Sequence, residues 1–170
     1  PVALPVRILC TMYVDFFRGV PTILVILLLG FGVPALQLKG VTNSPVVWGT
    51  VALILSYTAY VAEVYRAGIA SIHPSQRAAA RSLGLSSMQT TRYVVLPQAV
   101  RRVTPPLLND FIALQKETAL VSLLGPIEVL RAAQISASSN FNYTAYVVAA
   151  LFFVAITLPL MSQLVPHFGE

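Results

Sequence analysis

Four charged residues interrupt stretches of sequence that are otherwise apolar, and these side chains are the best placed to act on a solute. They are Glu63, Asp110, Lys116 and Glu117. A charge inside a membrane helix costs about 2.5–3.5 kcal/mol on insertion scales, so such a residue usually faces a bundle interior or an aqueous path. Carboxylates on that path attract an amino or guanidinium group. The pattern predicts a path for a zwitterionic or cationic solute.

The spacing of these residues assigns them to helical faces. Asn109 and Lys116 are seven residues apart, as are Asp110 and Glu117, so each pair lies on one face about two turns apart. We expect both pairs and Glu63 to belong to the substrate path. The alternative is that Lys116 pairs with Glu63 or with an acid of a partner subunit and only fixes helix packing.

The sequence argues against several other kinds of chemistry. The single cysteine, Cys10, permits no intrachain disulfide, and His73 and His167 lack acidic or cysteine neighbours at ligand spacing. We therefore expect no metal site. There is also no glycine-rich phosphate loop and no convergent set of nucleophile and base. We expect a chain that is not an enzyme and that binds no cofactor of its own.

The composition selects the environment. Of 170 residues, 56% are hydrophobic and only 10% are charged, which is too little polar surface to cover a soluble globule of this size. The net charge of +5 could suit nucleic acid, but the basic residues flank apolar runs and fit lipid headgroups better. The lipid bilayer is therefore the expected surrounding.

Apolar runs long enough to cross about 30 Å of hydrocarbon define the elements that position these charges. They predict an all-α integral membrane bundle in one domain, residues 1–170, with four transmembrane helices at about 19–38, 46–65, 105–125 and 143–164. The third run is the weakest because Asp110, Lys116 and Glu117 interrupt it. Arg18, at the start of the first run, is expected to reach headgroups rather than to touch the solute.

The loop at 66–104 sets the expected orientation because it is rich in arginine. Eight arginines would lie on its side of the membrane, against Lys39 and Arg131 on the other. Basic residues accumulate on the cytoplasmic side, so the loop and both ends of the chain are predicted to be cytoplasmic. The eight are Arg7, Arg18, Arg66, Arg77, Arg81, Arg92, Arg101 and Arg102.

Within this loop the sequence predicts two helices. Gly84 suits the end of a short helix over about 75–83, and Ser86 with Gln89 suits a capping box that opens the next. Pro97 is expected to stop that second helix. The run of alanines at 78–80 leaves a small face beside Arg77, which would suit a shallow cleft on a partner. An amphipathic helix resting on headgroups is the alternative.

The order Ala79-Ala80, Gly84, Val94, Leu96-Pro97 resembles the EAA motif of ATP-binding cassette (ABC) importer permeases, with its spacing kept. The run RSLGLSSMQTTRYVVLPQAVRRVTPPLLNDFIALQKETAL is similar to the polar amino acid branch of that family, as are FFRGVP at 16–21 and AYVAEVYRAGI at 59–69. The resemblance implies a coupling helix that docks in a groove of a cytoplasmic ATPase. The implied coupling residues are Arg77, Ala78, Ala79, Ala80, Arg81, Gly84, Leu96 and Pro97.

The resemblance also implies partners. These are two ATPase subunits that bind the ATP and magnesium, a second permease chain of the same or a related kind, and an external solute-binding protein, all at the inner membrane of a prokaryote. Such permeases usually have five spans, so a first helix is expected before Pro1. Ala78 replaces the leading glutamate of the motif, and Lys116-Glu117-Thr118-Ala119-Leu120 replaces the family's Lys-Asp-Thr-Ser-Leu.

Two other functions fit parts of the sequence. An ATP-independent secondary transporter or channel could couple Glu63 and Glu117 to protons, although it has no need of a docking helix. A helix-turn-helix DNA reader would match the run from Ala78 to Val94, but a loop held between two membrane spans lacks the soluble core of such a domain. We expect no nucleic acid partner.

Overall fold

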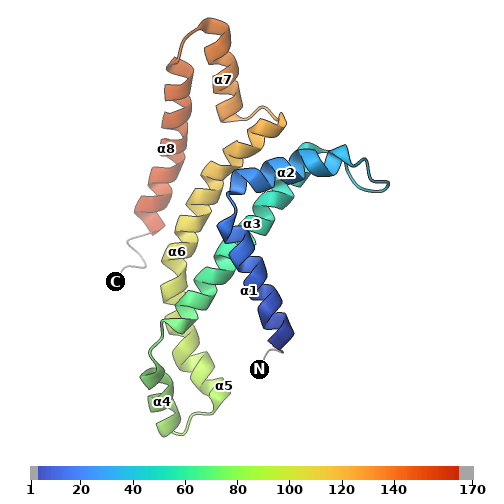
Figure 1. Ribbon diagram of the computed structural model, residues 1–170. Helices are drawn as coiled ribbons and strands as arrows, with labels where there is room; N and C mark the ends of the chain where they lie inside the picture. The colour runs from blue at the N-terminus through green and yellow to red at the C-terminus, as the bar shows by residue number, and fades with distance from the viewer. Residues whose placement is uncertain (1–3, 165–170) are drawn as a thin grey trace.

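The computed structural model describes residues 4–164, and within that range the chain is helical without any strand (Figure 1). This confirms the all-α expectation. The elements are α1 (Leu4–Gly19), α2 (Thr22–Ala35), α3 (Pro45–Ala70), α4 (Pro74–Ser82), α5 (Ser87–Thr90), a π-helical turn (Thr91–Val95), α6 (Leu96–Glu117), a 3₁₀ segment (Thr118–Leu124), α7 (Val129–Asn140) and α8 (Thr144–Leu164).

Two helices, α3 and α8, are long and apolar enough to cross a membrane by themselves. Two further spans are possible if bent helices are taken as pairs. One pair is α1 with α2, bent by 98°, and the other is the helical run from Ser87 to Leu124 with α7, bent by 53°. The total is then up to four.

The first expected span, 19–38, differs from the structure. A break at Val20 and Pro21 separates α1 from α2, because proline lacks an N–H group and disfavours helical geometry in the residue before it. The 14 residues of α2 reach only about 21 Å at 1.5 Å per residue. The preceding helix α1 was not predicted, since Arg7, Asp15 and Arg18 interrupt its apolar pattern.

The third expected span, 105–125, is the second half of a much longer helix. The prediction that Pro97 stops the second loop helix is wrong, because helical structure continues from Ser87 to Leu124. In the π-helical turn before Pro97, the N–H group of Leu96 donates to the carbonyl of Thr91. A single π turn of this kind widens the helix by one residue and adjusts its register. The run ends at Gly125, whose φ of +114° breaks the helix.

The other two expected spans agree closely with helices. The span 46–65 lies within α3, which continues past Arg66 to Ala70, and 143–164 coincides with α8. The 66–104 segment is therefore mostly helical, since it contains the end of α3, α4, α5 and the start of α6. The short helix α7, which packs against α8, was not predicted.

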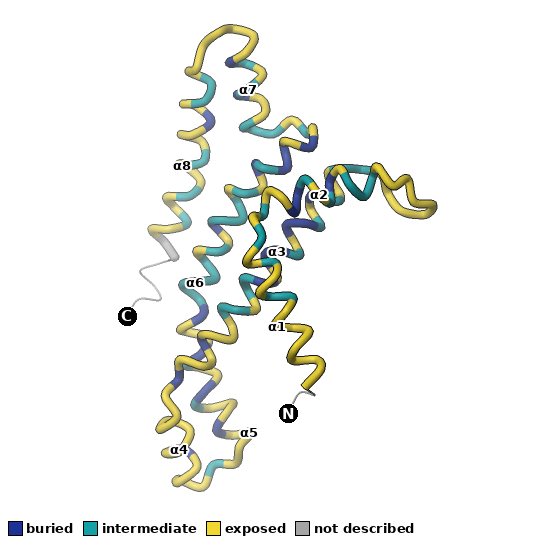
Figure 2. The backbone as a smooth tube through the Cα atoms, viewed as in Figure 1, coloured by how far each residue is buried: buried dark blue, intermediate teal, exposed yellow. Residues whose placement is uncertain are grey.

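The buried core is small and lies where α2, α3 and the 3₁₀ segment meet. Its members include Ile26, Ala52 and Leu53, together with Val121 and Leu124. Elsewhere many large apolar residues are exposed, and Figure 2 shows that exposed residues are frequent along α1 and α8. Such an exposed apolar surface is expected where lipid or other subunits replace water.

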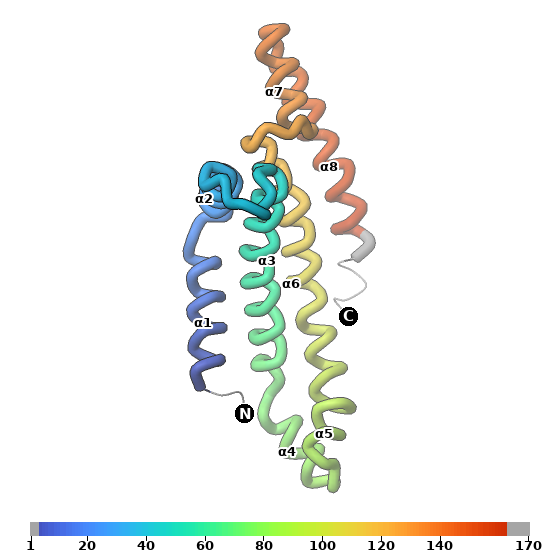
Figure 3. Tube along the Cα trace, turned by 90° about the vertical axis from the view of Figure 1, so that its right-hand side faces the viewer, coloured from blue at the N-terminus to red at the C-terminus, as the bar shows by residue number. Residues whose placement is uncertain are grey.

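Three helices run alongside one another and carry the polar residues of interest. Figure 3 shows α3 between α1 and α6, with α8 next to α6. The α4–α5 connection forms one end of the molecule, and the α7–α8 connection forms the other (Figure 1). Any signal that passes between the α4 end and the polar residues must therefore travel along α3 and α6.

Candidate functional site

The short helix α4 has defined caps at both ends. His73 accepts a hydrogen bond from the Ser75 N–H at the start. At the other end Gly84 has a φ of +85°. Its N–H donates to the carbonyl of Arg81, and the N–H of Leu85 donates to the carbonyl of Ala80. This pair of bonds is a Schellman motif, which favours glycine at the position with positive φ. The prediction that Gly84 ends the helix is confirmed.

The turn that follows α4 is fixed by side chains. Ser86 and Gln89 form the predicted capping box, in which Ser86 Oγ accepts from the Gln89 N–H and Gln89 Oε1 accepts from the Ser86 N–H. Arg81 donates to Ser87 Oγ across the turn. The α4–α5 hairpin is therefore held by local bonds that the sequence itself specifies.

Helix α4 packs against α5 and the π-helical turn of the long helical run, and its Ala80 is buried. Beside it, Ile72 of the segment between α3 and α4 forms a buried cluster with Val95 and Ala99 of that run. The remaining residues expected to couple are exposed: Arg77, Ala78, Ala79, Arg81, Gly84, Leu96 and Pro97. Of the three adjacent alanines, Ala80 thus packs inward, whereas Ala78 and Ala79 remain on the surface.

Two apolar side chains on this surface were missed by sequence reasoning. Leu83 is 84% exposed and Met88 is 76% exposed, on either side of the turn at Gly84. Their signal was their apolar character in an otherwise polar loop. Exposed apolar side chains beside arginines are typical of a surface that contacts another protein.

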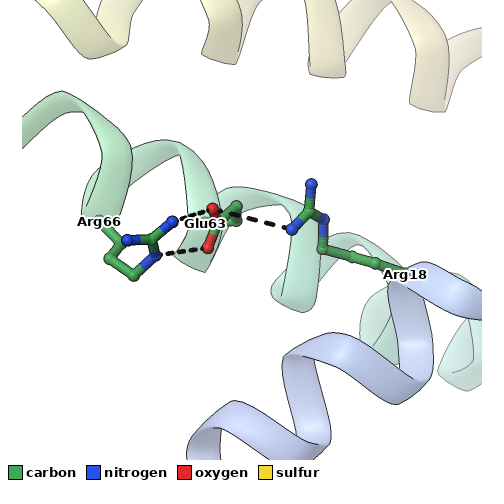
Figure 4. A network of polar contacts seen from close by, with 3 residues as sticks. All are labelled: Arg18, Glu63 and Arg66. Atoms are coloured by element: carbon green, nitrogen blue, oxygen red, sulfur yellow. Dashed lines mark hydrogen bonds and ion pairs between the residues drawn. The ribbon is translucent and has the colours of Figure 1, made fainter.

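Glu63 lies between two arginines that come from different helices. It accepts hydrogen bonds from both Nε and Nη2 of Arg66, the former at 2.7 Å, and Nη1 of Arg18 on α1 lies 3.8 Å from its Oε1 (Figure 4). In the structure Glu63 therefore pairs with these arginines and not with Lys116. Arg18 reaches back to α3, because helical side chains lean toward their own N-terminus.

The two carboxylates on the inner face of α6 have a different setting. Asp110 and Glu117 both lie near the buried Tyr57 of α3. One oxygen of each carboxylate is buried without a hydrogen-bond partner in the structure, and so is the hydroxyl of the fully buried Ser56. Buried polar atoms without partners are rare in native proteins, so this inner face is suited to a polar guest.

The five residues expected on the substrate path therefore lie in three different local environments. Glu63 belongs to the arginine cluster, and Asp110 with Glu117 faces Tyr57. Asn109 and Lys116 are exposed on the neighbouring face of α6.

A close helix contact joins this region to the α4 end. A Cβ atom added at Gly68 would overlap Cγ1 of Val103, so α3 and α6 approach closely there. Nearby, Arg102 donates to the carbonyl of Ser71 at 2.8 Å and so caps the end of α3. A positive charge at this position also complements the helix dipole.

Metal chemistry finds no support in the described part of the chain. Residues 4–164 contain no group of three potential metal ligands, and His73 serves as the cap of α4. His167 lies outside the described residues.

Comparison with known proteins gives a consistent result. Residues 5–164 match the family described as "Binding-protein-dependent transport system inner membrane component". The chain is 36% identical over 159 residues to the probable glutamine ABC transporter permease protein GlnM of Bacillus subtilis (strain 168), covering 92% of this chain and 71% of that protein. It is 38% identical over 146 residues to the probable amino-acid ABC transporter permease protein YckA of the same organism, covering 85% of this chain and 63% of that protein.

A solved structure has the same fold. The crystal structure of an amino acid ABC transporter with histidines aligns with 99% of this chain and 78% of its own, with a TM-score of 0.88 and 34% sequence identity. The match covers the long helices and the α4 hairpin alike, since almost no residue of this chain is left out. The chain therefore belongs to the family of binding-protein-dependent transport system inner membrane components, as a membrane permease subunit of the amino acid ABC transporter type.

Proposed function

We propose that this protein is the transmembrane permease subunit of an ATP-driven importer that moves polar or charged amino acids into the cytoplasm. The observation that carries the proposal is the α4 hairpin, a rigidly capped helix whose outer surface presents Arg77, Ala78, Leu83 and Met88 at one end of the molecule. A cytoplasmic ATPase would bind there. ATP and magnesium would belong to that partner.

The other proposed partners follow from family membership. A second permease chain, the same or related, would complete the path, and an external solute-binding protein would deliver the amino acid to the α7–α8 end. The α4 end would face the cytoplasm, because the segment 66–104 that forms it carries six arginines. Nucleic acid is not among the proposed partners, because α5 continues directly into the long membrane helix and is not a separate recognition helix.

Movement of α4 would reach the membrane through the close α3–α6 contact. The Ile72–Val95–Ala99 cluster joins the segment that leads into α4 to α6, and the contact of Gly68 with Val103 joins α6 to α3. Nucleotide-driven closure of the ATPases would therefore shift both helices together. The cycle is a population shift between inward-open and outward-open states, and it requires the ATPase to bind one state more tightly than the other.

The solute would meet the inner face of α6. The carboxylates of Asp110 and Glu117 would attract the amino group of an amino acid, and the hydroxyl of Tyr57 would contribute a polar contact beside them. Glu117→Gln is expected to alter the preference between cationic and neutral amino acids in a competition uptake assay. Arg101→Gln, at an exposed residue of the same helix that is not among the expected substrate-path residues, is the control. An unchanged solute profile for Glu117→Gln would contradict this assignment.

The docking proposal is tested by co-purification of the permease with its ATPase from membranes. Gly84→Asp places a side chain and a negative charge at the turn and is expected to abolish binding. Gly84→Asn has the same size without the charge and tolerates positive φ, so it separates the effect of charge from that of backbone strain. We expect the Gly84→Asn variant to retain more bound ATPase than the Gly84→Asp variant.

Each result has a definite meaning. ATPase bound by the wild type and lost only in Gly84→Asp supports the coupling surface. ATPase bound equally by all three forms places the contact elsewhere. If no form binds an ATPase and uptake persists without one, the protein is an ATP-independent transporter or channel and the proposal fails.

A further inference from the structure

A cavity lies between α1 and α3, and its mostly apolar walls carry several charged residues. Its volume is about 630 Å³, and the residues that line it include Arg7, Arg18 and Arg66. The two helices cross and then diverge toward the N-terminal end of α1 (Figure 1). The cavity lies where the two helices diverge.

The cavity has an excess of positive charge. Three arginines face two carboxylates, Asp15 and Glu63. Arg66 is occupied by two hydrogen bonds to Glu63, whereas Arg18 makes only a 3.8 Å contact with it. Among the described residues, no hydrogen bond or ion pair engages Arg7. Arg7 and Arg18 thus remain able to bind an anion, most naturally a phosphate, which guanidinium groups bind with paired N–H donors.

The walls of the cavity continue into an apolar groove. Cys10, Val14 and Ala62 supply apolar surface within the cavity. A second hollow of about 230 Å³ shares Arg7 and Thr11 with it and is lined by the side chains of Leu4, Ile8 and Met12. A cationic pocket that opens into an apolar groove matches a molecule with a phosphate head and a hydrocarbon tail.

The depth of the cavity also suits a headgroup. Arg66 is one turn from the end of α3, which at 26 residues is about 39 Å long and exceeds the roughly 30 Å hydrocarbon layer. Arg7 lies in the first turn of α1. Both arginines therefore lie near an edge of the membrane, where lipid phosphates are found.

From these observations we infer that the cavity between α1 and α3 binds the phosphate headgroup of an anionic phospholipid, with its acyl chain along the apolar side of α1. The inference does not rest on the proposed role of Asp110 and Glu117 or on the direction of transport. In this role the lipid would join α1 to α3 across the cavity.

The test is lipid retention by the purified, delipidated protein in detergent, measured by native mass spectrometry with phosphatidylglycerol or with zwitterionic phosphatidylcholine. Arg7→Gln removes a cation that makes no hydrogen bond or ion pair within the described structure, so we expect the fold to be preserved. Phosphatidylglycerol retention should fall about five-fold, the effect of one arginine near a membrane surface. Asp15→Asn raises the positive charge of the cavity and should increase retention. Arg101→Gln changes an exposed arginine of α6 outside the cavity and should have no effect.

Three results would overturn the inference. If Arg7→Gln and Arg101→Gln reduce phosphatidylglycerol retention equally, the lipid is attracted to the basic residues in general and not to this cavity. Equal retention of phosphatidylcholine and phosphatidylglycerol would show that charge plays no part. Inorganic phosphate or glycerol phosphate that displaces the lipid at equal concentration would show a site for a free anion.

A second experiment applies if Arg7→Gln yields no folded protein. A photoreactive phosphatidylglycerol is then cross-linked to the wild type, and labelling outside the α1 and α3 peptides counts against the site.

Discussion

Helix α3 makes two very different contacts with its neighbours. Against α6 it fits by shape, since Gly68 leaves just enough room for Val103. Against α1 it is held by polar groups, namely the Arg18–Glu63 ion pair and a hydrogen bond of 2.7 Å from the Tyr13 hydroxyl to the carbonyl of Leu55. A cavity of about 630 Å³ accompanies the second contact.

The difference indicates which parts move together. Close apolar packing resists deformation, because any separation of the surfaces loses dispersion contacts and leaves a void. Polar contacts around a cavity can exchange partners with lipid or water at little cost. We therefore expect α3 and α6 to behave as one body that carries motion from the α4 hairpin, and α1 to adjust independently.

The largest predicted effect comes from filling the contact between α3 and α6. Gly68→Ala adds a methyl group that overlaps Val103, and overpacking of this kind costs about 1–3 kcal/mol. We expect a lower Tm in detergent and reduced uptake. Gly32→Ala is the control, because a Cβ added at Gly32 has no neighbour within 4 Å.

A second substitution makes this prediction specific to the contact. Val103→Ala removes the overlapping methyl groups, so the Gly68→Ala/Val103→Ala double variant should recover most of the lost Tm. If Gly68→Ala behaves like Gly32→Ala, or if Val103→Ala gives no recovery, α3 and α6 do not pack as closely as described.

A smaller effect is expected at the contact between α1 and α3. Tyr13→Phe removes the hydrogen bond to the Leu55 carbonyl, and a typical intramolecular hydrogen bond contributes about 1 kcal/mol net. The Tm should fall by less than in Gly68→Ala, and uptake should be nearly unchanged. Tyr65→Phe, at an exposed tyrosine of α3, is the control. A loss of uptake in Tyr13→Phe as large as in Gly68→Ala would remove the distinction between the two contacts.

The parts of the fold that sequence predicted are those with local causes. Gly84 ends α4 and the Ser86–Gln89 pair opens α5 through bonds within a few residues of each other. The apolar runs of α3 and α8 are long enough to be identified alone. Such features need no knowledge of distant parts of the chain.

The parts that sequence missed depend on geometry beyond a single segment. The break at Val20 and Pro21 turns the chain by 98° between two helices whose combined composition suggests one span. The π-helical turn carries the helix past Pro97, where a local rule predicted an end. The short helix α7 packs against α8, and this contact with another helix cannot be read from its own sequence.

The candidate site shows the same division. Seven-residue spacing correctly placed Asp110 and Glu117 on one face, since both lie near Tyr57. Spacing of three residues could have assigned Arg66 as a partner of Glu63. It could not assign Arg18, which is distant in sequence and reaches Glu63 only through the crossing of α1 over α3. Which arginine reaches a carboxylate is a property of the packed helices.

The smallest predicted effect on stability concerns that ion pair. Exposed ion pairs contribute little to folding, so Glu63→Gln should hardly change the Tm, although it releases Arg18 from α3. The change should instead appear as looser attachment of α1 to α3.

A cross-linking assay measures this attachment. Native Cys10 and an added cysteine, Ala62→Cys, both line the cavity, and their cross-linking by a short bifunctional maleimide reports the separation of the two helices. We expect a lower yield in Glu63→Gln than in Asp15→Asn, which removes a carboxylate of the same cavity that forms no ion pair within the described structure. Equal yields would mean that Tyr13 and the apolar contacts hold α1 without help from Glu63, and α1 would then have to be counted with the rigid α3–α6 body.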